Sequence, residues 1–350
     1  MDKAKYHQAV GAMIGHMTGS MVCFGIWLGD EVGLWRAMHG SEPMTAADIA
    51  KAAGTNERLT LEWLRGQVAA QLLDYDEAAE TFLLSEEVAA LVADDTSPVF
   101  ISRGMYTTSA LYHDMDRIAQ TMRGDGKFAW GDHHPHLFKG TEWFFRTGYR
   151  AHLTSSWIPA MDGVVEQLTA GAAVADVGCG HGASAIVLAG EFPASRIVGF
   201  DYHAASVRVA RERAAEAGVG DRVEFEVAGA HDYPGSFDLI CFFDCLHDMG
   251  DPVGAARHAR ERLNPDGSVL LVEPFALDGP SNLTDNPMAP MLYIASAAIC
   301  TPTSLAQDVG LGLGAQAGPG RLREVFAEAG FSRFDVVSTS ALNMIVQARV

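Results

Sequence analysis

The chain has 350 residues, 48% of them hydrophobic, which is enough for one large domain with a sizeable core and a smaller one. A formal net charge of −19 argues against nucleic acid, because an acidic surface repels phosphate, and favours a small-molecule partner. No apolar run reaches the roughly 18–20 residues that span a bilayer, so we expect no membrane association. Five scattered cysteines without a C-x-x-C pair predict neither a disulfide framework nor a zinc knuckle, and indicate a reducing cytoplasm.

The first part of the chain, residues 1–98, is predicted to be mostly helical. The expected elements are a helix over 45–54, a helix from 57 to about 71, and strands at 72–75 and 81–84. The first helix begins with a capping-box pattern, Thr45 to Asp48, and ends at Gly54, while Asn56 caps the second. The two strands flank an acidic turn and predict a hairpin. A helix-turn-helix followed by a hairpin is a winged helix.

A winged helix is known either to bind DNA or to mediate dimerisation, and the charge of this domain decides between the two. Residues 1–98 contain 15 acidic and six basic side chains. The charges on the helix that would enter DNA cancel, since its charged residues are Glu57, Arg58, Glu62 and Arg65. We therefore expect the domain to mediate homodimerisation and not to bind DNA.

Residues 99–165 form a second helical segment, rich in aromatic residues and histidines, which we expect to be a linker and substrate lid. Its aromatic and histidine side chains would line an apolar acceptor pocket, or equally form the core between lid and sheet. The candidate acceptor contacts are Trp130, His133, His134, Phe145 and Tyr149. The three histidines within 133–136 have a spacing that could bind a metal, but a lid role is favoured.

From residue 166 to residue 350, short β-rich runs alternate with helical ones, which predicts a parallel sheet. The expected strands are 172–177, 196–201, 223–228, 237–243 and 268–273. The expected helices are about 182–191, 204–217, 252–264 and 319–329. Two further strands, 334–338 and 342–347, form a terminal hairpin. The predicted fold is α/β, with a seven-stranded Rossmann-like sheet behind the mainly helical N-terminal domain.

The most informative stretch is 174–182, Val-Ala-Asp-Val-Gly-Cys-Gly-His-Gly. Asp176 lies near the end of a buried strand, and Gly178, Gly180 and Gly182 follow at alternate positions. This spacing differs from the G-x-G-x-x-G fingerprint of dinucleotide folds. It closely resembles the glycine loop of class I S-adenosylmethionine-dependent methyltransferases. With a winged helix ahead of it, the chain resembles bacterial and plant small-molecule O-methyltransferases.

The resemblance implies S-adenosylmethionine as cofactor and S-adenosylhomocysteine as product, bound at the carboxyl ends of the strands. Asp176 and the loop residues would hold the methionine part; the loop residues are Gly178, Cys179 and Gly180. Asp201, at the tip of the second strand, would accept both ribose hydroxyls, and Tyr202 would pack on the adenine.

The third strand departs from the family pattern. Where relatives have an aspartate that bonds the adenine amine, this chain has Gly229. The expected replacement is the backbone N–H of Ala230, or the side chain of His231 or Asp232. At the end of the fourth strand, Phe243 falls where relatives touch the cofactor.

Residues 246–248, Leu-His-Asp, resemble the O-methyltransferase segment that carries the base. A hydroxyl must lose its proton as it attacks, and imidazole, with a pKa near 6.5, suits that task. The resemblance implies His247 as general base and Asp248 as its orienter, while a packing role for His247 stays open. The pair also admits a metal, which would need a further ligand from Asp278, Asp285 or Cys300, although we expect none.

The segment 275–318 is predicted to cover the pocket. Residues 282–303 indicate a helix, with Met291 as a further candidate acceptor contact, and the glycine-rich stretch 309–320 is predicted to be mobile. The predicted function is O-methylation of a hydroxylated or aromatic metabolite. The alternatives are N- or C-methylation of a similar compound, a protein that binds the cofactor without transferring methyl, and a metabolite-sensing transcription regulator.

Overall fold

The structure is a computed structural model that describes all 350 residues, and these form two compact units. The first unit comprises residues 1–112 and 135–148, and the second comprises residues 113–134 and 149–350. Each unit has a hydrophobic core of its own. The segment 99–165 thus contributes to both units, and its predicted role as a separate lid remains a prediction.

The first unit contains the winged helix. Its helices are α1 (Lys3–Glu31), α2 (Leu34–Met38), α3 (Ala46–Ala53), α4 (Glu57–Ala69), α5 (Glu86–Val92), η1 (Ser102–Gly104), α6 (Met105–His113) and α8 (His136–Gly148). Its strands β1 (Met44–Thr45), β2 (Asp74–Asp76) and β3 (Thr81–Leu83) form an antiparallel sheet in the order β1-β3-β2. The predicted helix-turn-helix and hairpin are confirmed.

The helix caps explain these boundaries. The Thr45 hydroxyl accepts from the backbone N–H of Asp48 at 3.3 Å and donates to the Asp48 carboxylate at 2.7 Å. Gly54 ends α3 in the left-handed region, at φ 68°, and Asn56 caps α4. Both caps satisfy backbone donors that the first helical turn leaves free.

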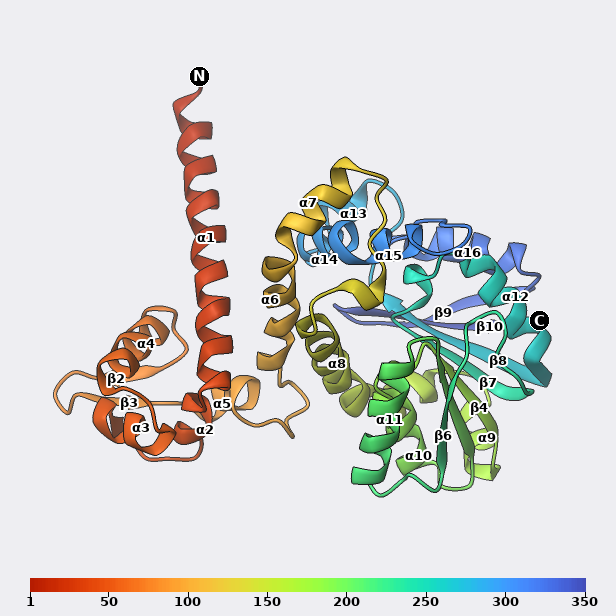
Figure 1. The fold of residues 1–350 in the computed structure, drawn as a ribbon, viewed down its shortest axis with the longest axis horizontal. Coiled ribbons are helices and arrows are strands. Elements are labelled where there is room, and N and C mark those ends of the chain that lie inside the picture. The colour runs from red at the N-terminus through yellow and green to blue at the C-terminus, as the bar shows by residue number, and fades with distance from the viewer. The chain divides into compact units, whose positions relative to one another are not determined.

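Helix α1 is a single element of 29 residues that the sequence analysis did not foresee (Figure 1). The Asp2 side chain caps it by accepting from the backbone of Ala4 and Lys5. An 18-residue window of α1 has a mean hydropathy of 1.4 and is only 6% buried, so by length and composition alone the helix could cross a membrane. The expectation that no apolar stretch is long enough was therefore wrong, because it counted interruptions such as His16 as breaks.

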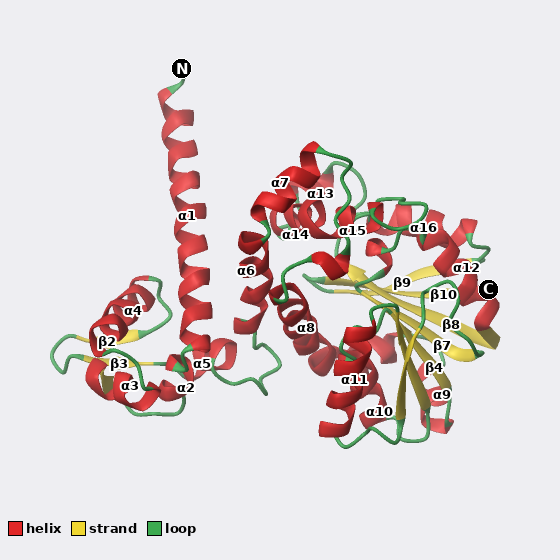
Figure 2. Ribbon diagram, in the orientation of Figure 1, coloured by secondary structure: helices red, strands yellow, loops and turns green.

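The second unit is built on a seven-stranded sheet with helices on its faces (Figure 2). The strands are β4 (Ala173–Val177), β5 (Arg196–Asp201), β6 (Val223–Val227), β7 (Phe237–Phe243), β8 (Leu263–Pro274), β9 (Arg333–Thr339) and β10 (Asn343–Arg349). Their order is β6-β5-β4-β7-β8-β10-β9, and β10 runs antiparallel to both of its neighbours. The predicted sheet is confirmed, including its terminal hairpin.

The helices of the second unit lie between and after these strands. They are α7 (Met115–Arg123), η2 (Trp130–Asp132), η3 (Tyr149–Trp157), η4 (Ile158–Ala160), α9 (Val164–Ala170), α10 (Ala183–Glu191), α11 (Ala204–Glu216), η5 (Leu246–Asp248), α12 (Pro252–Arg262), α13 (Ser281–Thr284), α14 (Ala289–Ala295), η6 (Ser296–Cys300), α15 (Thr301–Leu305) and α16 (Gly318–Glu328). Two of them, η3 and η6, are π-helical, a geometry that is frequent at functional sites.

The core of the second unit explains why its strands are nearly continuous apolar runs. Phe200, Phe242 and Phe326 are fully buried, as are most residues of β7 and β8. A parallel sheet covered on both faces buries both sides of each strand. The polar loops follow the carboxyl ends of the strands of this sheet, and the candidate site lies at that edge.

Candidate active site

The glycine loop after β4 turns sharply and leaves one side open. Gly178, Gly180 and Gly182 all have positive φ, of 76°, 52° and 78°. The backbone N–H groups of Gly178 and Cys179 donate to the Phe200 carbonyl at 2.8 and 3.0 Å, which ties the loop to β5. A Cβ added at Gly180 would meet no atom within 4 Å. The loop therefore presents bare backbone to a space that a ligand can enter.

Asp176, two residues before this loop, is fully buried in the sheet. The Ser184 hydroxyl donates to its Oδ2 at 2.5 Å, whereas its Oδ1 is buried without a hydrogen-bond partner. Burial, with a smaller contribution from the nearby Asp201, raises the pKa of this carboxyl to about 7, against the opposing effect of the bond from Ser184. An orphaned buried acceptor next to an open glycine loop indicates a cationic or donor group as ligand.

Asp201, at the end of β5, fixes the loop from the other side. Its Oδ2 accepts from the Gly180 backbone at 2.9 Å, and its Oδ1 accepts from the His203 backbone at 2.8 Å. Burial raises the pKa of Asp201, although both backbone bonds oppose the shift. Tyr202 follows with an exposed ring. Asp176, Asp201 and the glycines are thus brought together, as the sequence predicts.

The turn after β6 holds the other predicted adenine contacts. The Asp232 carboxylate accepts from the Gly229 backbone at 2.7 Å, so it closes its own turn. The His231 ring donates from Nε2 to the Asp251 carbonyl at 2.9 Å. Asp232 is thus bonded within its own loop and His231 to the residue that caps α12, and Ala230 is half-buried. The adenine contact predicted for Ala230, His231 or Asp232 remains a prediction.

His247 lies on η5 and is held by a residue that the sequence analysis did not select. Its Nδ1 makes a very short hydrogen bond to Glu273 Oε2. Glu273 Oε1 in turn accepts from the backbone of Leu246 and His247, at 3.1 and 3.3 Å. Asp248 instead approaches the other ring nitrogen, with its Oδ1 3.2 Å from Nε2. Glu273, and not Asp248, therefore sets the orientation of the ring.

The carboxylates around His247 offset the effect of burial on its pKa. Burial alone lowers the pKa of His247, but the carboxylates of Glu273 and Asp248 outweigh it and raise the pKa well above the ordinary value. Glu273 follows Val272, which pairs with Phe243 across the parallel strands β8 and β7. The sequence signal that could have identified Glu273 is its place as an acidic residue at the end of the strand beside the His247 loop.

Asp244 is a strained residue at the same edge of the sheet. It adopts φ 50° although it is not glycine, and such conformations cluster at functional sites. Asn343 donates to its Oδ1 at 2.9 Å and the Tyr149 hydroxyl to its Oδ2 at 3.4 Å. Burial, and secondarily Glu273, raises its pKa well above the ordinary value. The Tyr149 ring lies 5.3 Å from that of Phe243, so both predicted contacts are part of this cluster.

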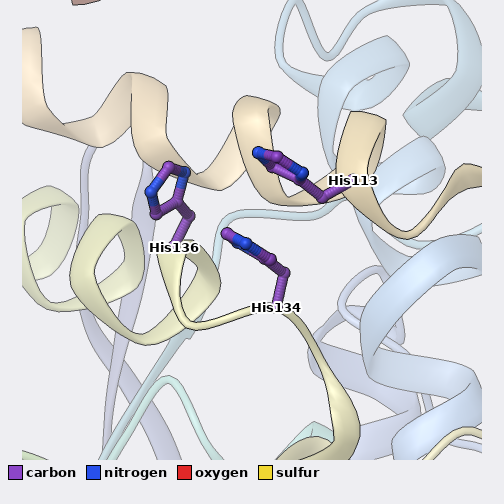
Figure 3. A group of neighbouring side chains, drawn as sticks. All are labelled: His113, His134 and His136. Atoms are coloured by element: carbon purple, nitrogen blue, oxygen red, sulfur yellow. The ribbon is translucent and has the colours of Figure 1, made fainter.

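The predicted acceptor contacts are divided between the units. Trp130, His133, His134 and Met291 lie in the second unit, whereas Phe145 lies in the first, where its ring meets Phe144 edge-on. His133 is buried with Nδ1 3.2 Å from the Asp114 carboxylate. The backbone N–H of His134 donates to the same Asp114 carboxylate at 2.9 Å, and its ring stacks on His113, with ring centroids 3.9 Å apart (Figure 3).

The second unit also contains a cavity of about 480 Å³. It is lined by side chains of α7, α14, η6 and α15 and by residues 313–316, and most of its wall is apolar. One lining residue, Gly314, donates its backbone N–H to the His247 carbonyl at 3.3 Å. Two others, Ser296 and Thr301, lie on η6 and α15 on either side of Cys300. The cavity wall therefore adjoins the His247 loop.

Comparison with known families fits this geometry. Residues 168–330 match a family described as "Methyltransferase domain", and residues 20–94 match an "Rv2258c-like winged HTH domain". The chain carries a methyltransferase domain behind a winged helix. The resemblance drawn from the glycine loop and the hairpin is thereby confirmed.

Curated relatives match only part of this chain. The 27-O-demethylrifamycin SV methyltransferase of Amycolatopsis mediterranei is 34% identical over 33% of this chain and 43% of its own length. A ubiquinone biosynthesis O-methyltransferase of Thiobacillus denitrificans is 33% identical over 29% of this chain and 44% of its own length. The chain thus spans less than half the length of these relatives.

Solved structures match over nearly the whole chain. Human N-acetylserotonin methyltransferase in complex with SAM has a TM-score of 0.72 at 19% identity and covers 98% of this chain and 97% of its own. PigF with SAH has a TM-score of 0.73 at 17% identity over 97% of this chain and 98% of its own. The mitomycin 7-O-methyltransferase MmcR has a TM-score of 0.68 at 19% identity over 100% of both chains. At these identities the likeness establishes the shared fold.

Proposed function

We propose that this protein transfers the methyl group of S-adenosylmethionine to a hydroxyl of a small aromatic or hydroxylated metabolite. The observation that carries the proposal is the carboxyl edge of the sheet, where the open glycine loop after β4 and Asp201 of β5 share one edge with His247 after β7 and Glu273 of β8. The methyltransferase domain and the O-methyltransferases among its relatives support the same activity.

The residues at this edge fit S-adenosylmethionine. The unpartnered Oδ1 of Asp176 suits the ammonium of the methionine part, directly or through water, and the open side of Gly180 admits a backbone-bonded ligand. Asp201 has lone pairs left for ribose hydroxyls, Tyr202 offers an exposed ring for the adenine, and Phe243 faces the same edge. When bound, the cofactor supplies a methyl group already activated on a sulfonium. The chain must align the acceptor and take its proton.

His247 is the residue for that proton. Because Nδ1 is held by the Glu273 carboxylate, the acceptor proton goes to Nε2, and Glu273 stabilises the imidazolium that forms. The bonds from the Leu246 and His247 backbone keep Glu273 in place. Asp248 acts from the Nε2 side, where it can hold the acceptor hydroxyl or the protonated ring.

The acceptor is proposed to occupy the cavity beside the His247 loop. Its volume of about 480 Å³ is within the range of small-molecule sites, roughly 300–1,000 Å³, and its apolar wall suits an aromatic compound. Tyr293, Ser296 and Gln316 would supply the few polar contacts. Trp130, His133, His134, Phe145, Tyr149 and Met291 remain proposed acceptor contacts of the lid.

A screen of methyl acceptors with isotopically labelled cofactor tests the function. Label in a hydroxylated or aromatic product, lost in His247→Ala with S-adenosylhomocysteine binding intact, is the expected result. Label on carbon or nitrogen would assign one of the alternative reactions. Cofactor binding without any labelled product would assign a non-methylating role. Ala297→Phe, which narrows the exposed mouth of the cavity, should raise KM for the acceptor more than it lowers kcat.

We also propose a cytoplasmic homodimer that assembles through the N-terminal domain, residues 1–98, ahead of a lid, 99–165, and the catalytic domain, 166–350. Helix α1 supports the dimer, because Met13, Met17, Met21 and Phe24 are 52–68% exposed along it. Glycines 11, 15 and 19 leave open space at four-residue spacing, where a second helix can approach closely. The five cysteines are all unpaired, as in a reducing compartment.

Light scattering coupled to gel filtration tests the dimer. Met17→Glu should give a monomer, whereas His16→Glu, an exposed neighbour on the same helix, should leave the mass unchanged. Co-sedimentation of the wild-type chain with lipid vesicles would assign α1 to a membrane and overturn both the dimer contact and the cytoplasmic location.

A further inference from the structure

Three side chains with metal-ligating atoms meet beside the sheet edge of the second unit. They are His247 and Asp248 on η5 and Cys300 at the end of the π-helical η6. Their ligand atoms all lie within 4.8 Å of one another, and His247 and Cys300 are buried. The Cys300 thiol is within hydrogen-bonding reach of both His247 and Asp248. Fifty-two residues separate the thiol from Asp248 in sequence, so only the fold assembles this group.

The spacing of the donors suits a tetrahedral ion. With metal–nitrogen and metal–oxygen bonds of about 2.0–2.1 Å, tetrahedral ligands lie about 3.3 Å apart, and a thiolate at about 2.3 Å lies about 3.6 Å from the nitrogen. His247 Nε2 and Asp248 Oδ1 are 3.2 Å apart. The third donor is within the distance that a small side-chain rotation closes. Three protein ligands and one open position are the pattern of zinc sites that bind a further group.

The residues around the three donors also favour a metal ion at this position. Glu273 holds Nδ1 of His247 and so aims Nε2 at the other two donors, as an outer-shell carboxylate does for a metal-bound histidine. Asp248 Oδ1 is buried and lies 3.2 Å from His247 Nε2, so this oxygen faces the histidine and not the solvent. No lysine or arginine forms an ion pair with Asp248 or Glu273, whose only such neighbour is the His247 ring. The pocket therefore gathers two carboxyls and a thiol around a single imidazole.

We propose that His247, Asp248 and Cys300 form a binding site for a divalent transition-metal ion of the zinc type. A nitrogen, an oxygen and a sulfur donor favour Zn²⁺ or Co²⁺ over Mg²⁺ or Ca²⁺, which prefer oxygen alone. The ion would bind His247 through Nε2, the atom to which the proposed methyl transfer sends the acceptor proton. Zinc and that proton therefore compete for one atom, and zinc inhibits turnover. Only this consequence rests on the proposed function.

Cobalt titration of the full-length, chelator-treated protein tests the site without any methyl acceptor. One equivalent of Co²⁺ should produce the near-ultraviolet thiolate-to-cobalt absorption and the intense visible bands of tetrahedral cobalt, and Zn²⁺ should bleach both. Cys300→Ser should lose the thiolate absorption. Asp248→Asn should weaken binding about tenfold or more. Cys23→Ser, a half-buried thiol on α1, is the matched control and should bind as the wild type does.

Binding of S-adenosylhomocysteine and the melting temperature show whether each variant is folded. Absence of a thiolate band in the wild type, or its persistence in folded Cys300→Ser, overturns the site. Zinc at the concentration that saturates the site should inhibit the wild type and leave Cys300→Ser at least tenfold less sensitive; equal sensitivity overturns the competition. If cobalt binds as expected but no acceptor is ever methylated, the metal site stands and the proposed function fails.

Discussion

Replacing Asp176 with asparagine tests the electrostatics of the glycine-loop region. The carboxyl is fully buried, and burial raises its pKa to about 7, against about 3.9 in an unfolded chain. A raised pKa means that the folded state holds the proton more tightly. This contribution to stability is fully present below about pH 4 and is lost as the pH rises through 7. Asparagine keeps the size and the Ser184 hydrogen bond but does not titrate.

The expected magnitude follows from the two pKa values. Between pH 5 and pH 8 the wild type should lose about 2–3 kcal/mol from this group, at about 1.4 kcal/mol per pKa unit. Without cofactor, Asp176→Asn should therefore gain that much stability relative to the wild type over the same range. Thermal unfolding at both pH values measures the difference. If the difference in free energy of unfolding between Asp176→Asn and the wild type is the same at pH 5 and pH 8, the reasoning is refuted.

Cofactor binding supplies the second readout for the same substitution. If the ionised carboxylate faces the ammonium of the methionine part, the wild-type affinity for S-adenosylhomocysteine should fall up to about tenfold per pH unit below pH 7. Asp176→Asn should bind more weakly at pH 8 and lose that dependence. Calorimetric titration across pH 5.5–8 measures both, and an unchanged affinity at pH 8 would show that Asp176 does not face the ligand.

Three further predictions test other parts of the structure. In Glu273→Gln, the backbone donors at Oε1 require an oxygen there, so the amide nitrogen faces His247 Nδ1 and forces the proton of the neutral ring onto Nε2. Turnover should then drop about 10²–10⁴-fold while cofactor affinity is kept. ¹⁵N spectra of the His247 ring should show the switched tautomer. Gly180→Val should abolish binding of S-adenosylhomocysteine in calorimetry without unfolding the chain, whereas Gly190→Ala, on an exposed face of α10, should bind normally and gain about 0.5–1 kcal/mol. Thr45→Ala should cost about 1 kcal/mol by chemical denaturation, and a loss below about 0.2 kcal/mol would contradict the capping role.

Much of the fold could be predicted from the sequence because its signals are local. The capping box at Thr45 and the glycine at 54 act within one helical turn, and both helix boundaries are confirmed. Strand β5 and strand β7 begin and end at the predicted residues, because a buried parallel strand is a short continuous apolar run. Helix α1 was missed because the apolar residues of its N-terminal half are exposed and mixed with glycines and His16.

The site was predictable only where its residues are close in sequence. The acid-x-Gly-x-Gly-x-Gly spacing identified the cofactor loop, and the structure ties that loop to Asp201. Glu273 and Cys300 lie 26 and 53 residues beyond His247. Their approach depends on the register of β7 with β8 and on the π-helical turn of η6. Neither is encoded in a local pattern.

By itself, the sequence determined the alternation of strands and helices, the winged helix, and a glycine loop suited to S-adenosylmethionine. Each of these depends on interactions within a few residues, where propensity, capping and backbone freedom act. The tertiary structure alone decided which carboxylate holds His247, which thiol faces it, and that Asp232 closes its own turn. Those contacts join segments that are distant along the chain, and only the packing of the sheet edge brings them together.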